Sequence, residues 1–248
     1  MLSPARRHLL KAKAAIEAAK ADEFGGVRPD ASVYQLQLTE LKNDIHVLRS
    51  IQSQEKRAEA KKELIPKHMP YVLGIVQSGA KVEQDEVITT IMLWCFDCGL
   101  FNQGLILAEY ALEQNLKMPD SFSRSTASIV AEEIGNAAHK AYQDGQIFKF
   151  DVLYKADQLT ANHDMHDQIR AKLYLGLGRT LLQLEHGAEA VEFIKKAIAK
   201  NENCGGKTDL KKAEKLYKEQ LKNSPEPMLN ADGSQVVDDQ GNLMFHPT

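Results

Sequence analysis

From residue 66 to residue 223 the sequence repeats one pattern, in which short segments with apolar residues at helical spacing alternate with short connectors. Strict alternation of apolar and polar residues, which would predict strands, does not extend far enough in this region to indicate one. Ala, Leu, Lys, Glu and Gln are abundant, and these residues lose little side-chain freedom in a helix. The sequence therefore predicts an all-α fold, a bundle of antiparallel helix pairs, with helices at 71–77, 83–98, 103–114, 125–142, 151–160, 167–184, 188–200 and 210–221.

Two parts of this region resemble each other. Residues 94–113 and 180–199 each contain a glycine, Gly99 or Gly187, followed by small and apolar residues at similar intervals. Both resemble the second helix of a tetratricopeptide-type hairpin, in which small residues let helices approach closely. The spacing after the two glycines differs by two residues, so the repeat is imperfect. It suggests tetratricopeptide-like character, a surface often used to hold peptides.

The first helix is predicted to be basic. Ser3 and Pro4 form a typical start, an N-cap followed by proline at the first helical position. Small alanines along this helix would allow close approach to a DNA groove, while its cations neutralise phosphates. The alternative is a terminal helix with ordinary surface charge. The candidate DNA-binding residues are Arg6, Arg7, Lys11, Lys13, Lys20 and Arg28, and the glycines and proline at 25, 26 and 29 indicate a hinge.

A long helix is predicted from about residue 32 to residue 64, and Pro66 and Pro70 are expected to break the chain after it. Its apolar residues follow the four–three spacing of a coiled coil. This seam predicts either self-association or a helix that packs its apolar stripe on its own domain, and the sequence does not choose between the two. The seam residues are Tyr34, Leu38, Leu41, Ile45 and Leu48.

Charge divides along the chain. Residues 1–67 contain 13 Lys and Arg against 9 Asp and Glu, whereas residues 225–248 contain 4 acids and no Lys or Arg. We predict a basic DNA-binding segment at 1–31, an oligomerisation helix at 32–65, a helical body at 66–223 and a flexible acidic C-terminal tail at 224–248. The positive end favours an acidic partner.

Other chemistry is not favoured. No apolar run is long enough to span a bilayer, and residues 1–20 lack the continuous apolar core of a secretory signal, so a cytoplasmic location without a membrane partner is expected. Cys95 and Cys98 lie in an apolar helical run and are expected to be core thiols. We predict no catalytic residue, no metal site and no cofactor. The motifs weighed and set aside were the Gly206-Lys207-Thr208 loop, the histidines and acids at 163–167, and the acid pairs at 85–86 and 132–133.

The order of these segments resembles that of the small terminase subunit family of contractile-tailed temperate phages, which package DNA through cohesive ends. The residues that carry the resemblance are Ser3-Pro4-Ala5, Arg7-His8, Lys61-Lys62-Glu63-Leu64, Pro66, Pro70, Gln84-Asp85, Met92-Leu93-Trp94, Asp97, Gly99, Ala108, Tyr110-Ala111-Leu112, Met118-Pro119, Glu132-Glu133, Asp164-Met165, Asp167 and Arg170-Ala171-Lys172-Leu173, with weaker likeness through Glu226-Pro227.

The resemblance implies a homo-oligomer, such as a ring, that recognises the packaging start on viral double-stranded DNA in the host cytoplasm. It also implies delivery of that DNA to the large terminase subunit, the ATPase and nuclease. Relatives carry a basic C-terminal region where this chain is acidic, so the tail is expected to dock the large subunit. Two alternatives remain open: that the chain is itself the endonuclease subunit, or that it is a helical-repeat scaffold for proteins only.

Overall fold

The computed structural model describes residues 3–23, 32–79, 81–120 and 122–223. Within these ranges the chain forms ten helices and no strand, so the all-α prediction is confirmed. The helices are α1 (Pro4–Glu23), α2 (Ser32–Ser50), α3 (Gln54–Ser78), α4 (Glu86–Asp97), α5 (Phe101–Glu113), α6 (Thr126–Gln143), α7 (Phe150–Thr160), α8 (Asp167–Gln183), α9 (Gly187–Lys200) and α10 (Lys207–Asn223).

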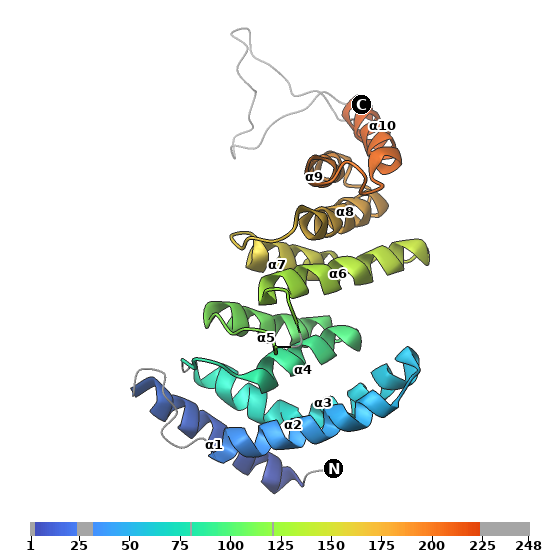
Figure 1. The fold of residues 1–248 in the computed structure, drawn as a ribbon. Helices are drawn as coiled ribbons and strands as arrows, with labels where there is room; N and C mark the ends of the chain where they lie inside the picture. Colours follow the sequence, from blue (N-terminus) through green and yellow to red (C-terminus); the bar gives the residue numbers. More distant parts are fainter. Residues whose placement is uncertain (1–2, 24–31, 80, 121, 224–248) are drawn as a thin grey trace, which may run out of the picture.

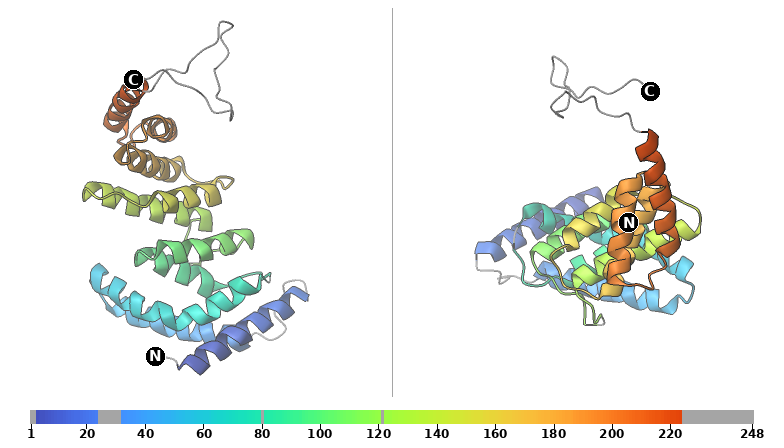
Figure 2. Two further views of the ribbon diagram at one scale, coloured as in Figure 1. Left: turned by 180° about the vertical axis from the view of Figure 1, so that it is seen from behind. Right: turned by 90° about the horizontal axis from the view of Figure 1, so that it is seen from above.

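The helices stack in layers along one axis, with α1–α3 at one end and α9 and α10 at the other (Figure 1). The same stack is seen from behind and from above in Figure 2. Consecutive helices pack as pairs, α4 with α5, α6 with α7 and α8 with α9, and α6 packs on α8 to join the layers. This is the predicted arrangement of helix pairs, while its tetratricopeptide-like character stays a prediction.

Buried apolar side chains form one large core and one smaller one. The large core runs from α1 to α8 and includes Tyr71, Ile91 and Leu153. The smaller core lies among α8, α9 and α10, around Leu181 and Ile194. The two cores are joined by aromatic side chains that pack against both of them, namely Phe150, Tyr174 and Phe193.

The single helix predicted over residues 32–64 is wrong, because α2 ends at Ser50 and α3 begins at Gln54. Ser53 has extended backbone, with φ −68° and ψ 127°, and its side chain accepts a hydrogen bond from the Lys56 N–H at 3.3 Å. A serine in this position satisfies a backbone donor that a helix start leaves unpaired. Arg57 also donates to the Ile51 carbonyl at 2.6 Å, which closes the end of α2. The chain therefore stops one helix and starts another.

The predicted break at Pro66 and Pro70 is also wrong, because both prolines lie inside α3. Each proline lacks one backbone donor, at a typical cost of about 3 kcal/mol in a helix interior. Burial of one face of α3, including Ile65, Tyr71 and Ile75, outweighs that cost. The helix ends instead at Gly79, whose φ of 65° costs a glycine little because it has no Cβ.

Candidate functional site

The position of α1 is set by a close crossing with α3, on which it packs more extensively than on α2. A Cβ atom at Gly74 of α3 would lie 2.6 Å from the Lys11 carbonyl oxygen and 3.1 Å from the Ala14 Cβ. Ala14 is 1% exposed at this crossing. The glycine and the alanine thus let the two backbones meet. Ala14 serves this packing and is not available for approach to DNA, which corrects one expectation from the sequence.

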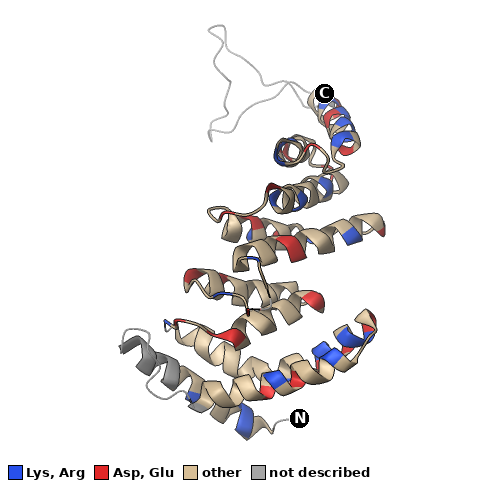
Figure 3. Ribbon diagram, viewed as in Figure 1, with Lys and Arg blue, Asp and Glu red and all other residues tan. Residues whose placement is uncertain are grey.

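A groove lies between α1 and α3, and its rim carries cations from both helices. Two adjoining hollows, of about 440 and 1000 Å³, share Arg7, Lys62 and Pro66 and form what we call the α1–α3 groove. The groove is lined by Arg6, Arg7, His8, Lys11, Lys62, Glu63, Leu64, Ile65, Pro66, Lys67, Met69, Pro70, Leu73, Leu100 and Gln103. Figure 3 shows basic positions on the described part of α1 and in the adjoining layer formed by α2 and α3.

Three of these cations keep their charge available. Within the described part of the chain, Arg6, Lys11 and Lys62 form no ion pair with an acid. Lys67, by contrast, is held by Asp44 at 2.7 Å and by Glu40 at 3.4 Å. Since no acid of the described residues pairs with them, Arg6, Lys11 and Lys62 outnumber the one carboxylate of the described lining, Glu63, and favour the binding of phosphate oxygens.

The structure brings together some of the sequence-predicted DNA-binding residues. Arg6, Arg7 and Lys11 line the α1–α3 groove, whereas Lys13 lines a separate groove between α1 and α2. Lys20 lies in α1, but its side chain is not among those described, and Arg28 lies outside the described residues. The same holds for the predicted hinge at 25–29 and for the acidic tail at 224–248.

Lys62 is the residue that sequence reasoning missed. It stands between acids in the run Glu59-Ala60-Lys61-Lys62-Glu63, which has the pattern of a solvated helix face. Its neighbour Lys61 turns away and pairs with Asp97. Only the crossing of α1 over α3 places Lys62 opposite Arg7, 55 residues earlier in the chain, and no local signal distinguishes Lys62 from Lys61.

The predicted seam of the second helix faces the chain's own core. Leu41 and Leu48 are buried, at 0% and 4% exposed, and Tyr34, Leu38 and Ile45 pack against the same core. Of the two interpretations that the sequence left open, packing on its own domain is the one that the structure shows. A role for these residues in self-association stays a prediction.

A buried polar network fastens α2 to α3. The carboxylate of Asp44 lies 2.7 Å from the Lys67 Nζ and 2.8 Å from the His68 Nε2. His68 is 0% exposed and its other ring nitrogen has no partner among the described residues. Burial lowers the pKa of His68, against the opposing effect of the Asp44 carboxylate. Burial thus favours the neutral imidazole, whose Nε2–H donates to the Asp44 carboxylate.

Helices α1 and α2 expose four large apolar side chains. Leu9 and Leu36 are 53% and 68% exposed and line the groove of about 440 Å³ between the two helices. Ile16 and Val47, further along α1 and α2, are 58% and 57% exposed. The side-chain oxygen of Gln37, buried beside this groove, has no partner among the described residues. We call Leu9, Ile16, Leu36 and Val47 the end face, because they are exposed on the two helices α1 and α2, which lie at one end of the stack (Figure 1).

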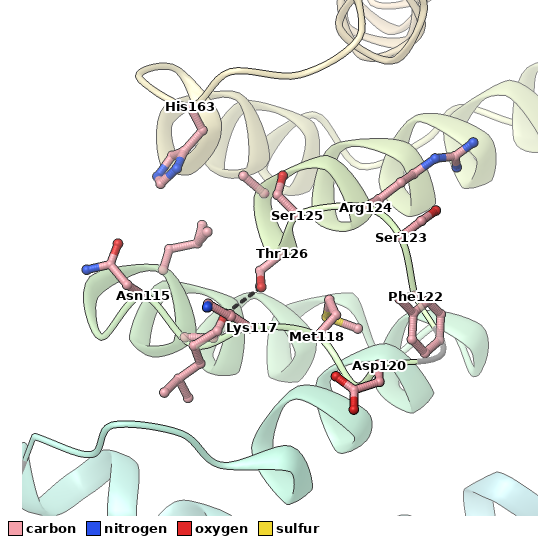
Figure 4. Close-up of a pocket in the computed structure, with 14 residues that line it drawn as sticks. Asn115, Lys117, Met118, Asp120, Phe122, Ser123, Arg124, Ser125, Thr126 and His163 are labelled. Atoms are coloured by element: carbon pink, nitrogen blue, oxygen red, sulfur yellow. Dashed lines mark hydrogen bonds between the residues drawn. The ribbon is translucent and has the colours of Figure 1, made fainter.

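Another hollow, of about 460 Å³, lies where α5 gives way to α6 (Figure 4). Thr126 and Arg124 of its lining, and Gln84 nearby in the chain's fold, hold the segments that join α5 to α6. The Thr126 hydroxyl donates to the Leu116 carbonyl at 2.6 Å, and Gln84 binds both the N–H and the carbonyl of Lys117. Arg124 forms an ion pair with Glu132. Phe122, which also lines the hollow, is 37% exposed.

The remaining motifs have structural roles. Asp85 is buried and caps α4, accepting hydrogen bonds from the Val87 N–H at 3.0 Å and the Tyr71 hydroxyl at 2.8 Å. Cys95 is buried among apolar side chains, which raises its pKa to about 12. In the 163–167 motif, His166 occupies the cap position of α8, although its side chain makes no capping hydrogen bond.

Metal ligands and membrane-spanning helices are both missing from the described residues. None of their groups of His, Cys, Asp and Glu is arranged to hold a metal ion. Nor is any of their helices both long and apolar enough to cross a membrane.

Comparison with known proteins gives a consistent result. A family model described as phage small terminase subunit matches residues 38–168. The chain is 34% identical over 231 residues to the "Terminase, endonuclease subunit" of Escherichia phage P2, which covers 93% of this chain and 90% of the relative. It is 28% identical over 145 residues to the "Probable terminase, endonuclease subunit" of Haemophilus phage HP1, and this match covers 57% of this chain and 50% of the relative. No solved structure matches.

Proposed function

The chain belongs to the phage small terminase subunit family and functions in viral DNA packaging, and we propose that it does so by binding viral DNA through the α1–α3 groove. The observation that carries this proposal is the convergence of Arg6, Arg7, Lys11 and Lys62 on one groove. Cations from two helices that are fixed by tight packing can contact successive phosphates of one duplex. The bound DNA is then delivered to the large terminase subunit.

Self-association supports this binding. The end face exposes four large apolar side chains, Leu9, Ile16, Leu36 and Val47. The terminal helices of a helical stack normally present polar residues to solvent instead. The opposite end, α10, is rich in charged side chains. The groove beside the end face also carries both signs of charge, with Arg6, Lys13 and Glu40 in its lining. We therefore place the contact between copies on the end face, with the Tyr34–Leu48 seam supporting it from inside.

Several copies would engage one duplex at once. Linked weak contacts of this kind raise avidity by about 10²–10⁴. Phosphate contacts release counterions, so affinity falls steeply with salt. The segment boundaries at 1–31, 32–65, 66–223 and 224–248 serve as a working division, although α3 runs across residue 65.

The test of DNA binding is a salt-varied titration of the triple variant R6A/K11A/K62A in the full chain. We expect weaker binding and a log–log salt slope that is less steep by about 1 for each phosphate that the variant no longer neutralises. The matched control is K211A/K212A/K218A on α10, which removes the same charge from exposed positions at the far end of the stack. Equal losses of affinity in both variants would show that net charge alone matters and would refute a groove-specific interaction.

The test of self-association is the mass in solution of the variant L36S/V47S. We expect smaller assemblies than the unchanged chain forms. The matched control is I147S, which removes another side chain that is 54% exposed but lies outside the end face. An unchanged mass of L36S/V47S would show that the end face is not the contact between copies.

The names of the two relatives favour one alternative, in which the chain is the endonuclease subunit itself. Magnesium-dependent DNA cutting by the pure chain, abolished by E132Q at a position away from the α4 cap, would support that alternative. Without such cutting, the adaptor function stands.

A further inference from the structure

The α1–α3 groove contains apolar surface that DNA phosphates do not need. Besides the cations that we call its rim, the groove is lined by apolar residues that we call its floor, namely Ile65, Pro66, Met69, Pro70, Leu73 and Leu100. Phosphates are bound by cations and by N–H or O–H donors, so these six side chains add nothing to a backbone contact. A positive rim over an apolar floor fits a peptide that carries both carboxylates and apolar side chains.

Residues 224–248 of the same chain have this composition. They contain Glu226, Asp232, Asp238 and Asp239 and no Lys or Arg. Apolar residues flank the last two acids, with Val236-Val237 before them and Leu243-Met244-Phe245 after them. The segment therefore offers carboxylates for Arg6, Lys11 and Lys62, and apolar side chains for the floor.

We propose that the acidic segment 224–248 occupies the α1–α3 groove of its own chain and competes there with DNA. The inference rests on the proposed function, since it assigns a regulator to the same groove. It gives the chain a closed state, in which carboxylates take the place of phosphates on the rim, and an open state that binds DNA.

The segment is long enough to reach the groove. The described chain ends at Asn223 in α10, at the end of the stack opposite to α1 and α3 (Figures 1 and 2). Helices that touch lie about 8–10 Å apart, so the steps from α10 through α8, α6 and α4 to α3 span roughly 32–40 Å. Leu243 follows Asn223 by 20 residues, and an extended chain of that length reaches roughly 66 Å.

Tethering makes a weak interaction effective. A flexibly linked segment has an effective concentration in the millimolar range. A segment that binds the groove with a dissociation constant of about 0.1 mM would then fill about nine grooves in ten. Because DNA binds only the open fraction, its apparent affinity would be lower by about tenfold.

The first experiment separates docking from simple charge repulsion. The full-chain variant L243S/M244S/F245S keeps every acid but removes the apolar side chains. We expect it to bind DNA about tenfold more tightly at low salt, because the segment no longer holds the floor. Unchanged affinity in this variant, together with tighter binding by E226Q/D232N/D238N/D239N, would mean that the segment only repels DNA and would overturn the proposal.

The second experiment needs no DNA. A photo-activated phenylalanine analogue at position 245 of the full chain is irradiated at low concentration, and the cross-links are mapped by mass spectrometry. Cross-links to α1 or α3 within one chain, reduced by K62E, support the proposal. Cross-links only elsewhere, or only between chains, overturn it. If the chain bound no DNA, the proposed function would fail, and this experiment would still decide whether the segment occupies the groove.

Discussion

Replacing Gly74 by alanine tests the packing that forms the groove. In most helix interiors this change stabilises the helix by about 1 kcal/mol. Here the new Cβ would lie 2.6 Å from the Lys11 carbonyl oxygen, a backbone atom that cannot rotate away. We therefore expect G74A to weaken the docking of α1 on α3, against the effect on helix propensity.

The size of the effect follows from these two opposing contributions. Overpacking costs about 1–3 kcal/mol, and a 2.6 Å approach to a backbone oxygen belongs to the upper part of that range, about 2–3 kcal/mol. A net destabilisation of about 1–2 kcal/mol would lower the docking equilibrium of α1 roughly 5–30-fold. Because Arg6, Arg7 and Lys11 reach the groove only from a docked α1, DNA affinity should fall as the docked fraction falls.

Amide hydrogen exchange measures this docking directly, because α1 amides exchange when the helix undocks. G74A should speed exchange in α1 by the same factor of roughly 5–30 while leaving α6 to α10 protected. Gly135→Ala is the matched control in α6, since its nearest neighbours, the Leu173 nitrogen and the Lys172 Cγ, are 3.3 Å away. A G74A chain with α1 exchange as slow as before, or slower, would refute the tight crossing at this glycine.

Three further predictions concern stability. The pKa of His68 is lowered in the folded chain, so as the pH falls the unfolded chain takes up this proton first. The contribution of His68 to stability should therefore be complete above about pH 6.5 and should decrease as the pH drops below it. We expect the thermal midpoint of H68Q to depend less on pH over that range. Asp85→Ala removes the α4 cap and leaves the Tyr71 hydroxyl without this acceptor, so urea unfolding should show a destabilisation of about 2–4 kcal/mol, and a value below about 0.5 kcal/mol would contradict the cap. Gly178→Ala would bring a Cβ to 2.5 Å from the Ile194 Cγ1, and should lower stability by about 1–3 kcal/mol through the α8–α9 packing, whereas an increase would mean that Ile194 moves aside freely.

Much of the helical body could be predicted from the sequence, because amphipathic spacing and caps are local properties. The predicted helices 125–142 and 167–184 match α6 and α8 to within one residue at each end. Ser3 and Pro4 also start α1 as predicted, with the Arg6 N–H donating to the Ser3 hydroxyl at 3.3 Å.

The errors fell where a tertiary interaction opposed a local signal. Pro66 and Pro70 signal a break, yet burial of one face of α3 keeps the helix continuous. The seam of α2 has coiled-coil spacing, yet α3 and α4 cover it, because one apolar stripe serves equally well inside a chain or between chains. The spacing of a stripe does not encode which partner covers it.

The candidate site shows the same division. Sequence alone determined that the chain is helical, that its first helix is basic with Arg6, Arg7 and Lys11 along it, and that residues 224–248 are acidic. Only the tertiary structure decided that Lys62 joins these cations while Lys61 pairs with Asp97. The reason is geometric: neighbouring residues on a helix point in different directions, and the crossing of α1 at Gly74 selects which of the two lysines faces the groove.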